Sequence, residues 1–177
     1  MKPIHIAITD DNPKLIHSLK QNLAFFEEVK IVFTAIHGKD LLQKLSEYPL
    51  PEVILMDIEM PEINGIQATY EVSQRFGEKI KIIMLTVLEE EDKIFDAIQA
   101  GASGYLMKDE KPTRIINAIE EVIQGGVPMS MRVAQKTLGL LRQQKPMLSQ
   151  TETSKPEQFN LTSREVEILQ EIALGLS

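Results

Sequence analysis

Short apolar runs alternate with amphipathic stretches along the first 125 residues of this chain. A run of about four to eight residues rich in Ile, Val and Leu is typical of a buried strand. Five such runs occur, at residues 4–9, 30–35, 53–57, 80–86 and 103–107. The stretches between them carry apolar residues three or four positions apart, as one face of a helix requires. The pattern predicts an α/β fold, a five-stranded parallel doubly wound sheet with helices on both faces.

The pattern changes after the fifth predicted helix, at Gly125 and Gly126. Glycines that follow an apolar stripe are typical helix ends. A further helix is predicted beyond them, because four apolar residues would share one of its faces. They are Met131, Ala134, Leu138 and Leu141. We therefore assign residues 1–125 to the first domain and residues 126–142 to a connecting helix.

Residues 143–159 have few apolar side chains and many Gln, Lys, Pro, Ser, Thr and Glu residues. Such a segment has little surface to bury, so we predict a flexible linker. Residues 160–177 open with a capping pattern, in which Thr162 can cap a helix and Glu165 can reach back to the amide of the cap. We therefore expect a helical carboxyl-terminal fragment after the linker.

Composition narrows the classes of function. The net charge of -7 argues against nonspecific binding of polyanions, which needs clustered Lys and Arg. No apolar run approaches the roughly 20 residues of a membrane span, and the amino terminus lacks the apolar stretch of a signal peptide. The chain has no cysteine, which excludes disulfides and suits a reducing cytosol. We expect a soluble, cytoplasmic protein without a membrane partner.

Polar residues follow the predicted strands at their carboxyl ends, where open parallel sheets bind ligands. Asp10 and Asp11 follow the first strand, Asp57 ends the third, Thr86 ends the fourth and Lys108 follows the fifth. Each residue alone has an ordinary explanation, such as a helix cap or a solvated charge. Together they predict one site at one rim of the sheet.

Three carboxylates in one pocket repel each other, by roughly 4 kcal/mol for a pair about 4 Å apart at an effective dielectric near 20. Mg²⁺ removes this penalty, since it takes carboxylates, waters and a phosphate oxygen. Asp57 stands alone after an apolar run that would fix its direction, whereas Asp10 and Asp11 form a pair suited to ion binding. We predict that Asp57 is a phosphoacceptor. Lys108 and Thr86 would then contact phosphoryl oxygens.

These motifs resemble the receiver domain of bacterial response regulators. They are Asp10-Asp11, Asp57-Ile58-Glu59-Met60-Pro61 with Gly65, Leu85-Thr86, and Ala100-Gly101-Ala102-Ser103-Gly104-Tyr105-Leu106-Met107-Lys108. The resemblance covers residues 1–125 in the family's order and spacing, and it implies a flavodoxin-like fold. It also implies that Asp57 takes a phosphoryl group from a phosphohistidine on a sensor histidine kinase.

The resemblance implies a metal site and limited chemistry. Asp11, Asp57 and the backbone carbonyl of Glu59 would hold Mg²⁺, and Asp10 would orient a coordinated water. The protein would be a phosphoacceptor regulator rather than an enzyme, catalysing only its own Mg-dependent phosphorylation and dephosphorylation.

The family also couples an aromatic residue to the rim hydroxyl, which implies that Tyr105 and Thr86 form a switch. Drawing Thr86 toward the phosphoryl group would open space for Tyr105 to rotate, biasing an existing two-state equilibrium. The connecting helix is a candidate for homodimer formation on phosphorylation, although an apolar stripe more often packs on its own domain.

Residues 161–177 resemble the opening helix of the LuxR-type helix-turn-helix domain, which implies a transcriptional regulator of the NarL/FixJ class. Specific DNA readout needs a recognition helix and positive charge. The sequence stops before such a helix. From Gln144 onward it contains three basic residues and five acidic ones. We expect a chain truncated inside its effector domain, with DNA a partner only of the intact protein.

Three other classes fit less well. Haloacid-dehalogenase phosphatases carry an Asp-x-Asp-x-Thr run after the first strand, where this chain has Asp10-Asp11-Asn12-Pro13. A nucleotide-binding module would carry a glycine-rich loop at the same place. A receiver that only binds proteins would not need the complete set of site residues.

Overall fold

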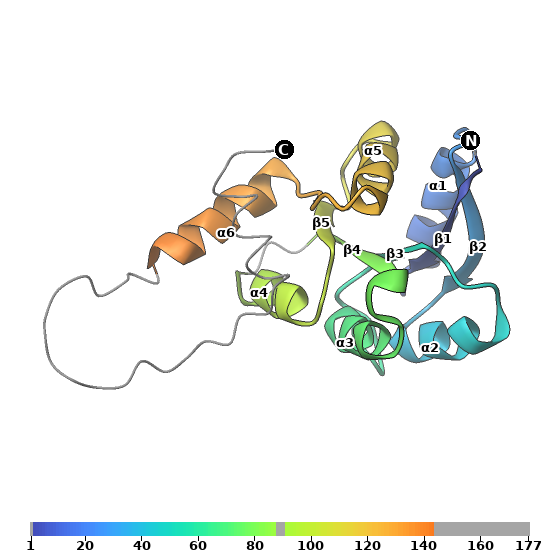
Figure 1. Ribbon diagram of the computed structural model, residues 1–177, viewed down its shortest axis with the longest axis horizontal. Helices are drawn as coiled ribbons and strands as arrows, with labels where there is room; N and C mark the ends of the chain where they lie inside the picture. The colour runs from blue at the N-terminus through green and yellow to red at the C-terminus, as the bar shows by residue number, and fades with distance from the viewer. Residues whose placement is uncertain (1, 88–90, 144–177) are drawn as a thin grey trace, which may run out of the picture.

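The computed structural model describes residues 2–87 and 91–143, and it contains a five-stranded parallel sheet with helices on both faces (Figure 1). The strands are β1 (Ile4–Thr9), β2 (Val29–Ala35), β3 (Val53–Met56), β4 (Lys81–Thr86) and β5 (Gly104–Met107). Their order in the sheet is β2-β1-β3-β4-β5. The predicted doubly wound fold is confirmed, and each strand ends within one residue of its predicted limits.

Helices connect the strands and cover the sheet. They are α1 (Pro13–Leu23), α2 (Gly38–Glu47), α3 (Gly65–Phe76) with the short 3-10 turn η1 (Gly77–Lys79), α4 (Glu91–Gln99), α5 (Pro112–Ile123) and α6 (Met131–Gln143). Helices α1 and α5 lie on one face of the sheet, and α2, α3 and α4 lie on the other (Figure 1). No helix in residues 2–87 and 91–143 is long and apolar enough to cross a membrane.

The helices that follow the two acidic loops begin with side-chain caps. Asn12 accepts a hydrogen bond from the Lys14 amide at 3.0 Å, and Pro13 occupies the first turn of α1. Asn64 and Gln67 form a capping box at the start of α3. Both loops at the acidic rim are therefore fixed by a capped helix.

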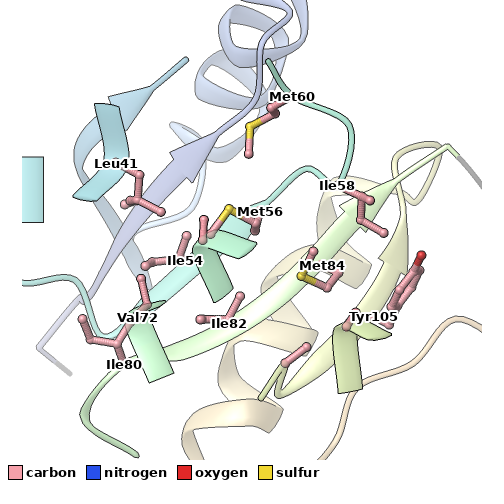
Figure 2. Close-up of a cluster of buried hydrophobic side chains, with 14 of the residues drawn as sticks. Leu41, Ile54, Met56, Ile58, Met60, Val72, Ile80, Ile82, Met84 and Tyr105 are labelled. Atoms are coloured by element: carbon pink, nitrogen blue, oxygen red, sulfur yellow. The ribbon is translucent and has the colours of Figure 1, made fainter. Parts of the chain in front are cut away.

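Each face of the sheet buries its own apolar cluster. Ile54, Met56 and Ile82 belong to the cluster under α2, α3 and α4 (Figure 2). Leu55 belongs to the cluster under α1 and α5, because successive strand residues point to opposite faces. Burial of each such aliphatic side chain stabilises the fold by about 1.5–3 kcal/mol. Since β3 is buried on both faces, its direction toward the rim is fixed.

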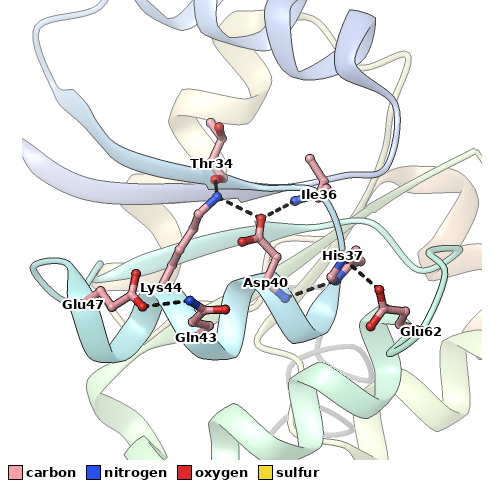
Figure 3. A network of polar contacts seen from close by, with 8 residues as sticks. All are labelled: Thr34, Ile36, His37, Asp40, Gln43, Lys44, Glu47 and Glu62. Atoms are coloured by element: carbon pink, nitrogen blue, oxygen red, sulfur yellow. Dashed lines mark hydrogen bonds and ion pairs between the residues drawn. The ribbon is translucent and has the colours of Figure 1, made fainter.

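The outer edge of β2 is tied to α2 by side chains (Figure 3). The Lys44 ammonium donates to the Thr34 carbonyl and to Asp40 Oδ2, both at 2.8 Å. The same Asp40 oxygen accepts from the Ile36 amide at 3.0 Å. His37 caps α2, because its Nδ1 accepts from the Asp40 amide at 3.1 Å. This network covers main-chain groups at one edge of the sheet.

Helix α6 lies at the opposite edge, beside β5 and α4 (Figure 1). Its buried side chains are Val133 and Thr137, whereas Met131 is 77% exposed. The predicted apolar face is therefore wrong at Met131. The segment before α6 is bonded to β5, which turns position 133 rather than 131 toward the sheet. The predicted linker beyond residue 143 and the carboxyl-terminal fragment lie outside the described residues.

Candidate functional site

The strand order reverses between β1 and β3, and two of the predicted acids lie at that point. Asp10 directly follows β1, and its amide donates to the Ala35 carbonyl at 3.1 Å. Asp57 directly follows β3, and its amide donates to the Thr9 carbonyl at 2.9 Å. Main-chain hydrogen bonds of the sheet therefore fix the backbone positions of Asp10 and Asp57.

The structure brings four of the predicted residues together. Asp10, Asp11 and Asp57 each offer a carboxylate oxygen, and these atoms lie within 4.8 Å of one another. Asp10 and Asp57 are buried, and Asp11 is exposed. The Lys108 ammonium lies 2.5 Å from Asp10 Oδ2 and 2.9 Å from Asp57 Oδ2. The site thus combines three carboxylates with one side-chain cation, the ammonium of Lys108.

The surroundings of Asp57 stabilise its negative charge incompletely. Burial raises the pKa of Asp57 above its usual value, and this effect outweighs Lys108, whose hydrogen bond and charge act the other way. The negative charge of Asp10 adds to the rise. Burial alone would lower the pKa of Lys108, but its hydrogen bonds to Asp10 and Asp57 raise it above the usual value. Lys108 is therefore a firmly charged cation that two carboxylates share.

The donor set fits a hard divalent cation, which prefers carboxylate oxygens. The ammonium already held between Asp10 and Asp57 shows that this pocket binds positive charge. Backbone amides orient both carboxylates, since Asp57 Oδ1 accepts from the Ile58 amide and Asp10 Oδ1 from the Asn12 amide, each at 2.8 Å. Asp11, at the exposed side of the group, adds a third oxygen.

The loop after Asp57 folds tightly back on it. The Gly65 amide donates to the Ile58 carbonyl at 2.9 Å. A Cβ atom at Gly65 would lie 1.9 Å from the Asp57 carbonyl oxygen, so a side chain there would displace the backbone of Asp57. Glu59 lies on this loop, and its side chain pairs with Lys93 of α4. The glycine keeps the loop compact against the rim.

Thr86 and Tyr105 lie where the strand pattern placed them. Thr86 ends β4 and is buried, two residues beyond Met84, which pairs with Met56 of β3. It therefore lies at the same rim as Asp57. Tyr105 is buried on β5, in the apolar cluster that also contains Met84 (Figure 2). Tyr105 pairs with Met84, two residues before Thr86, and therefore lies farther from the rim than Thr86.

Two contacts near the site escaped sequence reasoning. The first is the ion pair between Glu59 and Lys93, whose residues stand 34 positions apart and form no sequence pattern. The second is the pairing of residues 128–130 with β5. A single bridge joins them, so the paired segment is too short to form an apolar run that would indicate a strand. Only the glycine pair before this segment signalled that the chain changes direction there.

Sequence comparisons give consistent relatives. The family described as response regulator receiver domain matches residues 6–120. The transcriptional regulatory protein LnrK of Bacillus subtilis (strain 168) is 34% identical over 175 residues, which cover 98% of this chain and 79% of LnrK. The transcriptional regulatory protein DegU of Brevibacillus brevis is 31% identical over 185 residues, which cover 98% of this chain and 76% of DegU.

Solved structures agree with the sequence comparisons. A two-component response regulator of the LuxR family from Aurantimonas sp. SI85-9A1 matches with a TM-score of 0.73 and 26% identity, over 79% of this chain and 99% of that one. The response regulator ChrA of a heme-sensing two-component system matches with a TM-score of 0.66 and 28% identity, over 100% of this chain and 78% of that one. The shared fold includes the strands that carry the acidic rim.

Proposed function

Because this chain belongs to the response regulator family, as a regulator of the LuxR/NarL type, we propose that Asp57 accepts a phosphoryl group from a phosphohistidine of a sensor histidine kinase. Phosphorylation and DNA binding are the functions of this family, whose members are not classical enzymes. One observation carries the assignment to Asp57. Its carboxylate is buried, 2.9 Å from Lys108, and grouped with Asp10 and Asp11 within 4.8 Å.

The proposed transfer is a single displacement at phosphorus. An Asp57 oxygen bonds to phosphorus as the phosphorus–nitrogen bond breaks, and the electron pair of that bond goes to the imidazole nitrogen. Catalysis of such a transfer is mostly positioning and charge stabilisation. Lys108 would bind one phosphoryl oxygen and the Thr86 hydroxyl would donate to another. The protein would catalyse only this transfer and the later hydrolysis of its own aspartyl phosphate.

Receiver domains bind Mg²⁺ at an acidic pocket, and the aspartate cluster supports the same here. Asp11, Asp57 and the backbone carbonyl of Glu59 would hold the ion, while Asp10 would orient a coordinated water. When bound, the ion neutralises charge that develops on phosphoryl oxygens. The raised pKa of Asp57 supports this requirement, because burial leaves its carboxylate poorly stabilised by Lys108 alone.

Phosphorylation would act through Thr86 and Tyr105. In this proposal Thr86 moves toward the phosphoryl group, and Tyr105 follows into the space that opens, which shifts an existing two-state equilibrium. The burial of both side chains supports a coupled movement, because neither can shift without repacking its neighbours.

Output would be transcriptional. Residues 161–177 resemble the opening of a LuxR-type domain, which supports DNA binding through a domain of that type. A homodimer formed on phosphorylation would present two such domains to paired half-sites. A cytoplasmic location follows from the proposed kinase and DNA partners.

The test is phosphorylation of the purified chain by acetyl phosphate with Mg²⁺, read by intact mass. We expect one added phosphoryl group, lost in Asp57→Asn and when a chelator replaces Mg²⁺. Asp40→Asn is the matched control, since Asp40 also pairs with a lysine, but it is only partly buried and lies on α2, away from the rim. An adduct that persists in Asp57→Asn would overturn the assignment.

A further inference from the structure

The edge of β5 is covered by the chain itself, through main-chain bonds to one residue. The Tyr105 amide donates to the Pro128 carbonyl at 2.8 Å, and the Ser130 amide donates to the Tyr105 carbonyl at 3.0 Å. Residues 128–130, here called the strap, thereby extend the sheet by one parallel bridge, between Tyr105 and Met129. The strap is therefore bonded to the proposed switch residue on both sides of its α-carbon.

Three further contacts hold the strap. Gly104 leaves room for it, because a Cβ atom there would lie 2.7 Å from Pro128 Cγ and 2.9 Å from the Pro128 carbonyl oxygen. Arg114 of α5 donates to the Met129 carbonyl at 3.2 Å. Ser130 Oγ accepts from the Val133 amide at 3.4 Å, which joins the strap to the start of α6. The strap and α6 thus form one continuous cover.

Apolar packing links α6 to the same switch residue. Val133 is 1% exposed and belongs to the buried cluster that contains Tyr105, Met107 and Ile94. Met129 of the strap packs against this cluster. Figure 1 places α6 along the β5 end of the sheet, next to α4. Because Val133 and Tyr105 belong to one buried cluster, a change in the position of the Tyr105 ring would alter the packing that holds α6.

We propose that the strap and α6 form a releasable cover over β5 and α4, and that phosphorylation of Asp57 loosens it by moving Tyr105. The inference rests on the proposed function and adds the route by which the acidic site reaches the carboxyl-terminal half of the chain. Movement of the ring toward Thr86 removes packing from the Val133 side of the cluster and strains the two main-chain bonds to the strap. Interior packing responds to such a change by adopting a second arrangement.

The coupling is reciprocal by linkage: if phosphorylation loosens the cover, loosening the cover favours the phosphorylated arrangement. Coupling of this kind commonly changes an equilibrium by about 5- to 150-fold. A covered β5 edge would thus hold the receiver in its unphosphorylated arrangement. The cover is the chain's own segment, so no partner is needed for this control.

The first measurement is amide hydrogen exchange of the full chain, before and after acetyl phosphate and Mg²⁺, with intact mass recorded on the same samples. We expect the amides of Tyr105 and Ser130 to exchange about 5- to 150-fold faster in the phosphorylated protein. Absence of any adduct would overturn the proposed function and the coupling with it. An adduct with unchanged exchange at both amides would overturn the coupling alone.

The second measurement uses a matched pair of variants in α6. Val133→Asp places a charge in the buried cluster, whereas Gln135→Asp places the same charge on the exposed face two residues away. We expect Val133→Asp to release the strap without phosphorylation and to be phosphorylated several-fold faster by acetyl phosphate, with Gln135→Asp like the parent. Val133→Ala, a milder change, should shift both readouts in the same direction. Equal rates in all four proteins would overturn the proposal.

Discussion

The two edges of the sheet are covered in different ways. An open sheet exposes unpaired amides and carbonyls along each edge strand, which invites pairing with other chains. At β2 the cover is made of side chains, with Lys44 on the Thr34 carbonyl and Asp40 on the Ile36 amide. At β5 the cover is main chain, with Tyr105 bonded to Pro128 and Ser130.

The difference separates a static edge from one that can respond. The β2 cover comes from α2, the next element in the chain, and its residues lie within ten positions of their partners. Nothing in it touches Asp57 or Lys108 among the described contacts. The β5 cover instead meets the sheet at Tyr105, the residue proposed to move with the phosphoryl group. Three matched pairs of variants and one single variant test whether this contrast is real.

The largest effects should come from the aromatic residue on each edge strand. Tyr105 on β5 is 1% exposed, and Phe33 on β2 is 7% exposed, with its ring centroid 5.6 Å from that of Tyr48. Truncation of either to Ala should lower the free energy of unfolding by about 3–5 kcal/mol, because each leaves a cavity. Urea unfolding measures this loss.

The two truncations should differ in hydrogen exchange. We expect faster exchange of the Ser130 amide in Tyr105→Ala and unchanged exchange there in Phe33→Ala. If both variants expose the Ser130 amide equally, the strap reports on global stability only, and the contrast between the edges fails.

A smaller effect should follow from a methyl group under the strap. Gly104→Ala should lower the free energy of unfolding by about 1–3 kcal/mol, because Pro128 must shift to admit the Cβ atom. Gly139→Ala is the control in α6, where the added carbon would meet no atom within 4 Å apart from adjacent residues and the helix's own backbone, and it should stabilise by about 0.5–1 kcal/mol. Opposite signs in urea unfolding support a strap seated on Gly104; a neutral Gly104→Ala would contradict it.

Sequence patterns predicted the sheet and the rim because both follow from local rules. Strand β3 is an unbroken apolar run, and such runs between helices indicate parallel pairing. The carboxyl ends of parallel strands meet at one rim, which placed Asp10, Asp57 and Lys108 together without knowledge of the fold's details.

Contacts that depend on docking could not be predicted in the same way. The apolar pattern of α6 included Met131 and omitted Val133, because the strap, rather than the helix pattern, decides which face meets the sheet. The Glu59–Lys93 ion pair joins a loop to a helix that the sequence does not place side by side. Such contacts are fixed by tertiary packing, which overrides local periodicity.

At the β2 edge, a pH dependence is expected from Asp40. Burial would raise the pKa of Asp40, but the hydrogen bonds from Lys44 and the Ile36 amide hold it below its usual value. Its stabilisation is therefore complete above the unfolded pKa of about 3.9 and is lost as the pH falls through the lower folded pKa. Asp40→Asn should lower the free energy of unfolding by about 1–2 kcal/mol at pH 7.

This deficit should shrink as urea unfolding is repeated at pH values below about 3.9, where the parent carboxyl becomes protonated. The exchange of the Ser130 amide should stay unchanged in Asp40→Asn, since the β5 cover is separate. A deficit that grows toward acid pH would reverse the assigned sign and exclude the Lys44 pair as its source.

The smallest effect is expected when the ammonium is removed from the β2 edge. Lys44→Met keeps the length of the stem but leaves the Thr34 carbonyl to water, at a cost of about 0.5–1.5 kcal/mol. Lys39→Met removes an ion pair to Glu62 whose lysine is 70% exposed, so its effect should be close to zero. Sedimentation at rising concentration should show self-association in Lys44→Met alone, because only that variant opens an edge strand. Equal behaviour of the two variants would mean that the β2 edge does not depend on this lysine for its cover, and the side-chain half of the contrast would have to be abandoned.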